Sequence, residues 1–200
     1  RLAGHLFSIT RDEIVKNGKC ITAHILECAE GDVEFSEGVF RVSGTDRAMG
    51  LFAVAKAAND SSYDLPESVK GPLRATTLID KPMPAYPNGC HVAEVEVDPE
   101  TGTVTLARYT AVDDCGRVVN PMIVDGQVHG GIGQGVGQAL WEEVVYDDDS
   151  GQLISGSFMD YVMPRADDLP MFTVGHNEVP TPTNRMGVKG GGEGGTTPAP

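Results

Sequence analysis

The chain has 200 residues, 40% of them hydrophobic, which is enough for one large domain or two small ones with a hydrophobic core. Its net charge of −14, from 15 basic and 29 acidic side chains, argues against a nucleic-acid partner, because this surface would repel phosphates. No apolar stretch approaches the roughly 18 residues that a membrane-spanning helix needs, so we predict no membrane span. The opening residues carry neither an initiator Met nor a signal peptide, and we expect them to come from the interior of a longer chain.

The chain holds four cysteines, Cys20, Cys28, Cys90 and Cys115. None belongs to a Cys-x-x-Cys pair or has a His at zinc-finger spacing, so we predict no structural zinc or iron–sulfur site built from this segment alone. The even number is compatible with disulfides, but the low density of cysteines and the length favour a reduced, cytoplasmic protein.

The first predicted element is a helix that opens at the capping box Thr10-Arg11-Asp12-Glu13 and runs to about Ala29. A hairpin follows, with strands at Val33–Ser36 and Val39–Ser43 around the turn Glu37-Gly38.

A second helix is predicted to be capped by Gly44-Thr45-Asp46. Its helical periodicity predicts a buried stripe made of Met49, Phe52, Ala53, Val54 and Ala57. Two loops, over Asp60–Pro72 and Asp80–Gly89, are indicated by their Pro, Ser and Asp content.

The pattern then changes to strands. His91–Asp98 alternates apolar and polar residues with one slip at Ala93-Glu94, and the turn Asp98–Gly102 leads to a second strand over Val104–Val112. Asp113-Asp114-Cys115-Gly116 is expected to end that strand.

Beyond the strands, a long helix is predicted over Gln127–Glu143. A further hairpin is expected from Val144–Tyr146 and Leu153–Ser157, with one short strand near Phe172–His176. Because helices and strands alternate irregularly and the strands pair mostly as hairpins, we predict an α+β fold with mixed or antiparallel hairpins packed on helices.

The long helix carries an unusual number of glycines, each of which costs about 1 kcal/mol relative to Ala in a helix interior. Helical spacing places Gly126, Gly130, Gly133 and Gly137 on one face, and this stripe would let a second backbone or a flat ligand approach the axis. The apolar side chains at a spacing of four are expected to form core; they are Val128, Ile132, Val136 and Leu140.

Two side chains near the start of this helix have functional interpretations. Gln127 is predicted in the first turn, where free N–H groups and the helix dipole favour an anionic ligand, although a solvated Gln beside helix-packing glycines is an equal alternative. His129 is interpreted as a packing or hydrogen-bonding residue, since no second ligand stands four residues on.

A glycine-rich run near the end of the chain, Gly187–Pro198, holds a single carboxylate, Glu193. Taken alone, such a run is typical of a flexible tail. Alternatively, glycine lets the backbone approach a ligand closely, and a lone carboxylate placed there is a candidate general base.

Several motifs together resemble the molybdenum-binding large subunit of the xanthine oxidase family, the molybdenum hydroxylases. Within that family they are most similar to the bacterial branch that includes carbon monoxide, isoquinoline and aldehyde dehydrogenases. The segments that carry the resemblance occur in the family's order and are His91–Gly102, Val112–Pro121, Gly126–Gly131, Ser157–Arg165 and Gly187–Glu193.

The resemblance implies roles for five residues. Glu193 matches the catalytic base beside molybdenum, and Gln127 matches a residue that contacts the pterin cofactor. Gly190, Gly191 and Gly192 would bring backbone close to the metal end of that cofactor, while no side chain of this chain is expected to bind the metal.

The resemblance also implies an activity and partners. The expected reaction is hydroxylation of a carbon centre (an aldehyde, N-heterocycle, purine or carbon monoxide) with oxygen from water. The cofactor would be molybdopterin with molybdenum, in its cytosine dinucleotide form. Electrons would leave through 2Fe-2S clusters and FAD on an iron–sulfur subunit and an FAD subunit, in a dimer of heterotrimers.

The family's large subunit is several times longer, and its earlier cofactor loops and substrate-selecting loop are not in this sequence. We therefore expect residues 1–200 to be a fragment of the cofactor-binding domain, with a helix-hairpin-helix part over 1–80 and the hairpin, glycine-rich helix and Glu loop over 90–200. The alternatives are a non-catalytic acidic scaffold or binding module, and an inactive truncated fragment.

Overall fold

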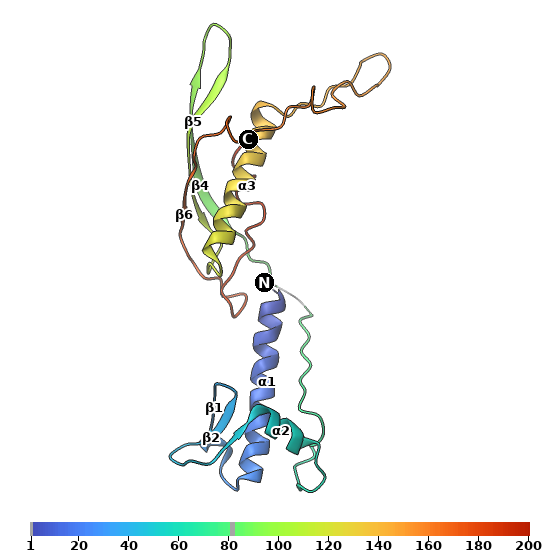
Figure 1. Ribbon diagram of the computed structural model, residues 1–200, viewed down its shortest axis with the longest axis vertical. Coiled ribbons are helices and arrows are strands. Elements are labelled where there is room, and N and C mark those ends of the chain that lie inside the picture. The colour runs from blue at the N-terminus through green and yellow to red at the C-terminus, as the bar shows by residue number, and fades with distance from the viewer. Residues whose placement is uncertain (1, 81–82) are drawn as a thin grey trace. The chain divides into compact units, whose positions relative to one another are not determined.

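The structure is a computed structural model that describes residues 2–80 and 83–200. The chain divides into two compact units, an N-terminal unit within residues 2–80 and a C-terminal unit within residues 83–200 (Figure 1). Each unit has its own sheet and its own hydrophobic cluster.

The N-terminal unit is built on the helix α1, Leu2–Ile25, which begins eight residues before the predicted capping box. Thr10 is therefore inside the helix, and its hydroxyl donates to the hydroxyl of Thr77 at 3.1 Å instead of capping. The prediction of the start was wrong because nothing in the preceding residues interrupts a helix. The helix also ends before Ala29, since Glu27 takes a positive φ of 47° and the Cys28 amide bonds back to Ala23 at 3.0 Å, as in a Schellman motif.

The predicted hairpin is confirmed as β1, Val33–Ser36, and β2, Val39–Val42, which pair antiparallel around Glu37-Gly38. A third strand that was not predicted, β3 (Ala48–Gly50), pairs with β2.

The second helix, α2, spans Leu51–Ala58, so the predicted cap near Thr45 was wrong. Thr45 closes a turn instead, where its hydroxyl donates to the Val42 carbonyl at 2.9 Å. Because the helix starts later, only part of the predicted stripe is buried: Val54 and Ala57 are, whereas Phe52 is 87% exposed.

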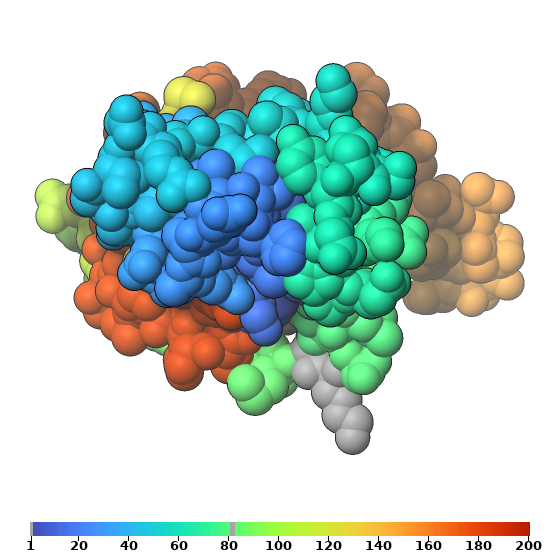
Figure 2. Space-filling model, turned by 90° about the horizontal axis from the view of Figure 1, so that it is seen from below, coloured from blue at the N-terminus to red at the C-terminus, as the bar shows by residue number. Residues whose placement is uncertain are grey.

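The core of the N-terminal unit centres on Phe40, which is fully buried. Its ring lies against Gly18 of α1 so closely that a Cβ on Gly18 would come within 2.2 Å of the ring. Figure 2 shows this unit from below, with α1 between the hairpin and the segment that follows α2. The other buried members of the cluster are Ile21, Ala23, Val33, Val54, Ala58 and Leu65.

The C-terminal unit has a sheet in the order β4-β5-β6. The predicted antiparallel hairpin is confirmed as β4, Asn88–Val97, and β5, Val104–Asp114, with a register shift between Glu94 and Val95 next to the predicted slip. The short strand is confirmed as β6, Thr173–His176, which runs parallel to β5. Helices packed on mixed and antiparallel strands confirm the α+β prediction.

The glycine-rich helix α3 spans Pro121–Leu140 and begins six residues earlier than predicted. Asn120 is its N-cap, with its side chain accepting from the Ile123 amide at 3.3 Å, and Pro121 follows where a missing N–H costs nothing. Gln127 is thus the seventh helical residue, and the prediction that it lies in the first turn was wrong.

One face of α3 packs on the sheet as predicted. Val128, Ile132 and Val136 are buried, and Leu140 packs against the same cluster. The sheet contributes the buried side chains Leu106, Tyr109 and Ala111.

The predicted hairpin after α3 is reduced to one bridge between Tyr146 and Leu153. None of the helices within residues 2–80 and 83–200 combines the length and apolar character that crossing a bilayer requires.

Candidate active site

The glycine-rich run at the end of the chain is tied to α3. The Gln127 side chain donates from Nε2 to the Gly192 carbonyl at 2.6 Å. The Glu193 carbonyl accepts from the amides of Thr196 and Thr197, each at 3.2 Å, and from the Thr197 hydroxyl at 3.1 Å. The first bond ties the loop to α3 and the others close a turn within it, unlike the free tail that composition alone indicates.

Glycines allow this loop to lie directly on the helix backbone, but they are not the predicted ones. A Cβ on Gly131 would lie 3.0 Å from the Cα of Gly195, and a Cβ on Gly195 would lie 2.5 Å from the Val128 carbonyl oxygen. By contrast, a Cβ on Gly126 or Gly130 would meet open space. No part of the protein covers the predicted stripe at these two positions, and the loop lies on the neighbouring face of the helix at Gly131.

A cavity of about 550 Å³ borders the loop on one side and contains the candidate base. Gly190, Gly192 and the exposed Glu193 contribute to its wall, and none of the described residues in its lining is Lys or Arg. The other lining residues are Pro87, Asn88, Gly89, His91, Asp113, Gly194, Thr197 and Pro198.

A buried polar cluster forms part of that wall. His91 of β4, whose side chain is only 3% exposed, contacts the Tyr109 hydroxyl through Nδ1 at 3.0 Å and Asp113 Oδ1 through Nε2 at 3.1 Å. Burial raises the pKa of Tyr109, with a further contribution from the charge of Asp113. Both imidazole nitrogens are engaged, so His91 fixes the Asp113 carboxylate at the cavity wall.

A second cavity, of about 460 Å³, lies along the same loop and includes Gln127, Gly191 and Gly192 in its lining. Gly192 is common to both cavities. In contrast to the first cavity, the second is lined by two cationic residues, Arg117 and Lys189. The remaining lining residues are Cys115, Val119, Asn120, Ile123, Val124, Met186 and Val188.

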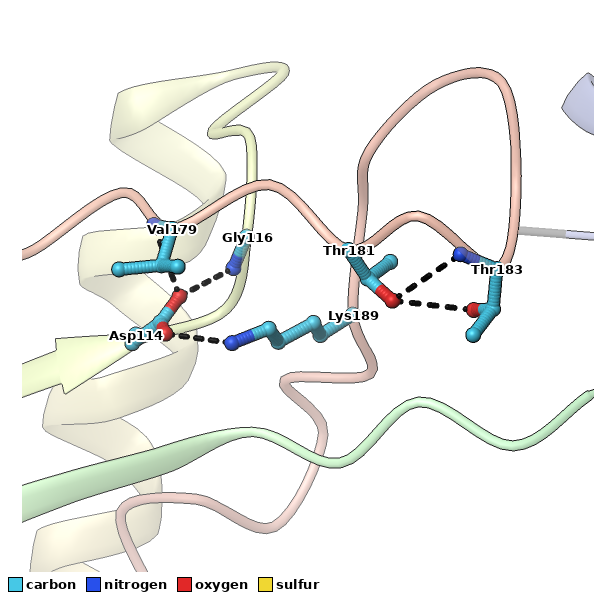
Figure 3. Close-up of polar contacts among 6 residues, drawn as sticks. All are labelled: Asp114, Gly116, Val179, Thr181, Thr183 and Lys189. Atoms are coloured by element: carbon cyan, nitrogen blue, oxygen red, sulfur yellow. Dashed lines mark hydrogen bonds and ion pairs between the residues drawn. The ribbon is translucent and has the colours of Figure 1, made fainter.

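Lys189 is not free to act in that cavity, because its ammonium group forms an ion pair with Asp114 (Figure 3). Burial acts to raise the pKa of Asp114, but the hydrogen bonds from Lys189, the Gly116 amide and the Val179 amide outweigh it and keep that pKa below its ordinary value. Asp114 is therefore ionised at neutral pH.

The loop offers open backbone to a ligand. A Cβ added at Gly190 or Gly192 would meet no atom within 4 Å, so both residues leave space along the cavities that a side chain would fill. Across the described residues, no three His, Cys, Asp or Glu side chains are grouped closely enough to hold a metal ion. All four cysteines are free thiols, and His129 packs edge-on against Phe172 with ring centroids 5.6 Å apart.

The structure thus brings the five sequence-predicted residues together on one loop and the facing helix. Sequence reasoning gave no role to His91, Asp113, Asp114 or Lys189, although each lies in a segment that carries the resemblance. The sequence pattern that could have pointed to them is an adjacent pair of carboxylates at the end of a strand, together with a lone Lys directly before the glycines.

Known proteins match the chain over most of its length. Residues 8–170 match the molybdopterin cofactor-binding domain family. The chain belongs to this family. It is similar in sequence and fold to one part of the molybdenum-binding large subunits of xanthine oxidase-type proteins.

Two curated relatives illustrate the match. The large chain of carbon monoxide dehydrogenase from Afipia carboxidovorans is 35% identical over 192 residues, which are 96% of this chain and 23% of the relative. The nicotine 6-hydroxylase large subunit of Paenarthrobacter nicotinovorans is 38% identical over 181 residues, which are 90% of this chain and 22% of the relative. The chain therefore spans less than a quarter of the length of these relatives.

A solved structure agrees in fold. Reconstituted CO dehydrogenase from Oligotropha carboxidovorans superimposes with a TM-score of 0.82 at 32% identity, covering 98% of this chain and 24% of that one. The resemblance stated from the motifs is thereby confirmed at the level of the family.

Proposed function

We propose that this chain is part of the catalytic subunit of a molybdenum hydroxylase, in which the loop at 190–193 and α3 hold the molybdopterin cofactor and Glu193 is the general base. The observation that carries the proposal is the placement of one exposed carboxylate on a glycine loop between two cavities. The expected substrate is a small molecule with an oxidisable carbon: carbon monoxide, an aldehyde, an N-heterocycle or a purine.

The residues present fit the cofactor. The open backbone at Gly190 and Gly192 permits close approach of a flat, polar group, and the Gln127 side chain fixes the Gly192 carbonyl beside it. In the second cavity, Arg117 and the amide of Gln127 offer hydrogen-bond donors to the oxygens of a phosphate-bearing pterin. No side-chain cluster of this chain competes for the metal, which the pterin would hold.

When bound, the molybdenum cofactor supplies oxygen transfer and accepts two electrons from the substrate. The contribution of Glu193 is to remove the proton from the water-derived oxygen as it attacks carbon. Among the described residues that line its cavity, none is a Lys or Arg that would pair with the Glu193 carboxylate. Being exposed, Glu193 can pass the proton on to solvent.

The partners follow from the electron balance. Each substrate oxidised by water releases two electrons and two protons, so the assembly needs an electron exit. We propose an iron–sulfur subunit and an FAD subunit for this exit, in a dimer of heterotrimers. Support comes from the names of the relatives, which are large chains or lettered subunits of complexes. The free thiols fit a reducing, cytoplasmic location.

The test is Glu193→Gln in the assembled holoenzyme, which keeps the size of the side chain and removes the base. We expect the molybdenum content to stay at the level of the unmodified enzyme and turnover to fall by about 10²- to 10⁴-fold. The matched control is Glu100→Gln in the exposed β4–β5 turn. Turnover in Glu193→Gln equal to that of the control would remove Glu193 from the role of base.

A further inference from the structure

Resting on the proposed function, we propose that Asp114 and Lys189 are positioning residues that set where the catalytic loop begins and thereby place Glu193. Neither side chain needs to touch the substrate for this role. Both act through the backbone of the loop that follows Lys189.

Asp114 joins three separate segments of the chain (Figure 3). Its Oδ1 accepts from the Gly116 amide at 2.8 Å and from the Val179 amide at 3.2 Å, while its Oδ2 accepts from Lys189 Nζ. The end of β5, the segment at 179 and the start of the loop therefore meet at one carboxylate. The side chains of Asp114 and Lys189 are only 6% and 11% exposed, so water contributes little to this junction.

The backbone reinforces the same point. The Lys189 amide donates to the Cys115 carbonyl at 2.8 Å, and Gly116 forms a bridge with Val188. The buried side chain of Asn184 adds two bonds to Val188, donating to its carbonyl at 2.8 Å and accepting from its amide at 3.3 Å. Lys189 is thus held through both its amide and its ammonium group.

The three residues that follow Lys189 are all glycines, which have more backbone freedom than any other residue. The position of Glu193 therefore depends on the anchors at the two ends of the run. At the far end these are the bond from Gln127 to the Gly192 carbonyl and the contact of Gly195 with α3. At the near end the anchor is Lys189.

The chemistry of the pair makes the inference testable. Removing one charge of a buried ion pair leaves the other unpaired in a poorly solvated site, whereas removing both charges together does not. If Lys189 acts through Asp114, neutralising both residues should repair the damage that neutralising Asp114 alone causes. If instead the charge of Lys189 acts directly on a ligand, neutralising both residues should not repair that damage.

The experiment compares Asp114→Asn, Lys189→Gln and the double variant in the holoenzyme, with molybdenum content measured for each. Hydrogen exchange of residues 186–197 reports on the loop independently of activity. Turnover per molybdenum and KM are measured with whichever of carbon monoxide, an aldehyde, a purine or an N-heterocycle the unmodified enzyme oxidises.

For Asp114→Asn we expect faster exchange in the loop and a kcat lower by about 10²-fold, the effect of a base displaced by about 1 Å, with KM within about threefold. In the double variant, hydrogen exchange of the loop should be slow again, and kcat should be at least about tenfold higher than in Asp114→Asn. The exposed pair Arg108–Glu94, 3.4 Å apart on the same hairpin, supplies the control: neutralising both should change neither readout.

Normal exchange and normal kcat in Asp114→Asn would overturn the proposal, as would a double variant no better than Asp114→Asn. If Asp114→Asn fails to assemble, the double variant decides: recovery supports the proposal and failure overturns it. Glu193→Gln is measured beside them, since its retention of turnover would refute the proposed function, while the exchange data would still test the positioning of the loop.

Discussion

The two units of this chain are stabilised in different ways. In the N-terminal unit the buried residues are apolar side chains around Phe40, and Thr22 is the one polar residue among the described residues that are buried there. The C-terminal unit buries several polar side chains as well, among them Asp113, Asp114 and Asn184. These groups lie at the loop that carries Glu193, so polar burial accompanies the candidate site, while the other unit is an apolar scaffold.

The contrast teaches where substitutions should act. The hydrophobic effect is non-directional. Removing a buried apolar side chain should therefore lower the stability of the fold without a specific effect on the loop that carries Glu193. Buried polar pairs have fixed geometry and penalise any unpaired member, so their loss should move the loop first. The predictions that follow test this difference, in addition to the variants of Glu193, Asp114 and Lys189.

The largest effect is expected in the N-terminal unit. Phe40→Ala should lower the free energy of unfolding by about 3–5 kcal/mol, because it leaves a cavity beneath α1. Phe52→Ala, at a ring that is 87% exposed, is the control and should change that free energy little. Chemical unfolding followed by circular dichroism measures both, and equal losses would contradict the assignment of the core.

A smaller effect is expected where the loop touches α3. Gly131→Ala should destabilise the C-terminal unit by about 1–3 kcal/mol and speed hydrogen exchange at residues 190–197, since the new Cβ would lie 3.0 Å from backbone atoms of Gly195. At the neighbouring Gly130 a Cβ would meet open space. Gly130→Ala should therefore leave the free energy of unfolding unchanged or raise it by up to about 1 kcal/mol. The prediction fails if the two variants behave alike.

The smallest effect is a pH dependence from Asp114. Because its pKa is lowered in the folded state, its contribution to stability is complete above the unfolded pKa of about 3.9 and is lost as the pH falls through the folded value. Asp114→Asn should therefore flatten the acid limb of the stability curve below about pH 4. Unfolding measured at several pH values would detect this, and an unchanged acid limb would argue against the pairing with Lys189.

The hairpins and the apolar stripe of α3 were predictable because each has a local period or a turn signal. The starts of the helices were harder to predict, since Thr10 satisfies the pattern of a cap but lies inside α1. Strand register was another difficulty. Without the shift at Glu94, His91 would face Thr110 rather than Ala111, and its side chain would point to the opposite face of the sheet from Asp113.

The sequence by itself determined the α+β class and the family, and it singled out the five candidate residues on the Glu loop and helix, since these inferences depend on local periodicity and on the order of short motifs. Only the tertiary structure decided that Gly131 rather than Gly130 meets the loop, that Asp114 pairs with Lys189, and that Gly192 borders two cavities, one lined by Glu193 and the other by Arg117. The physical reason is distance along the chain. Asp114 and Lys189 are 75 residues apart, and what brings them together is the parallel pairing of β6 with β5 and the course of the segment beyond β6, which no local pattern encodes.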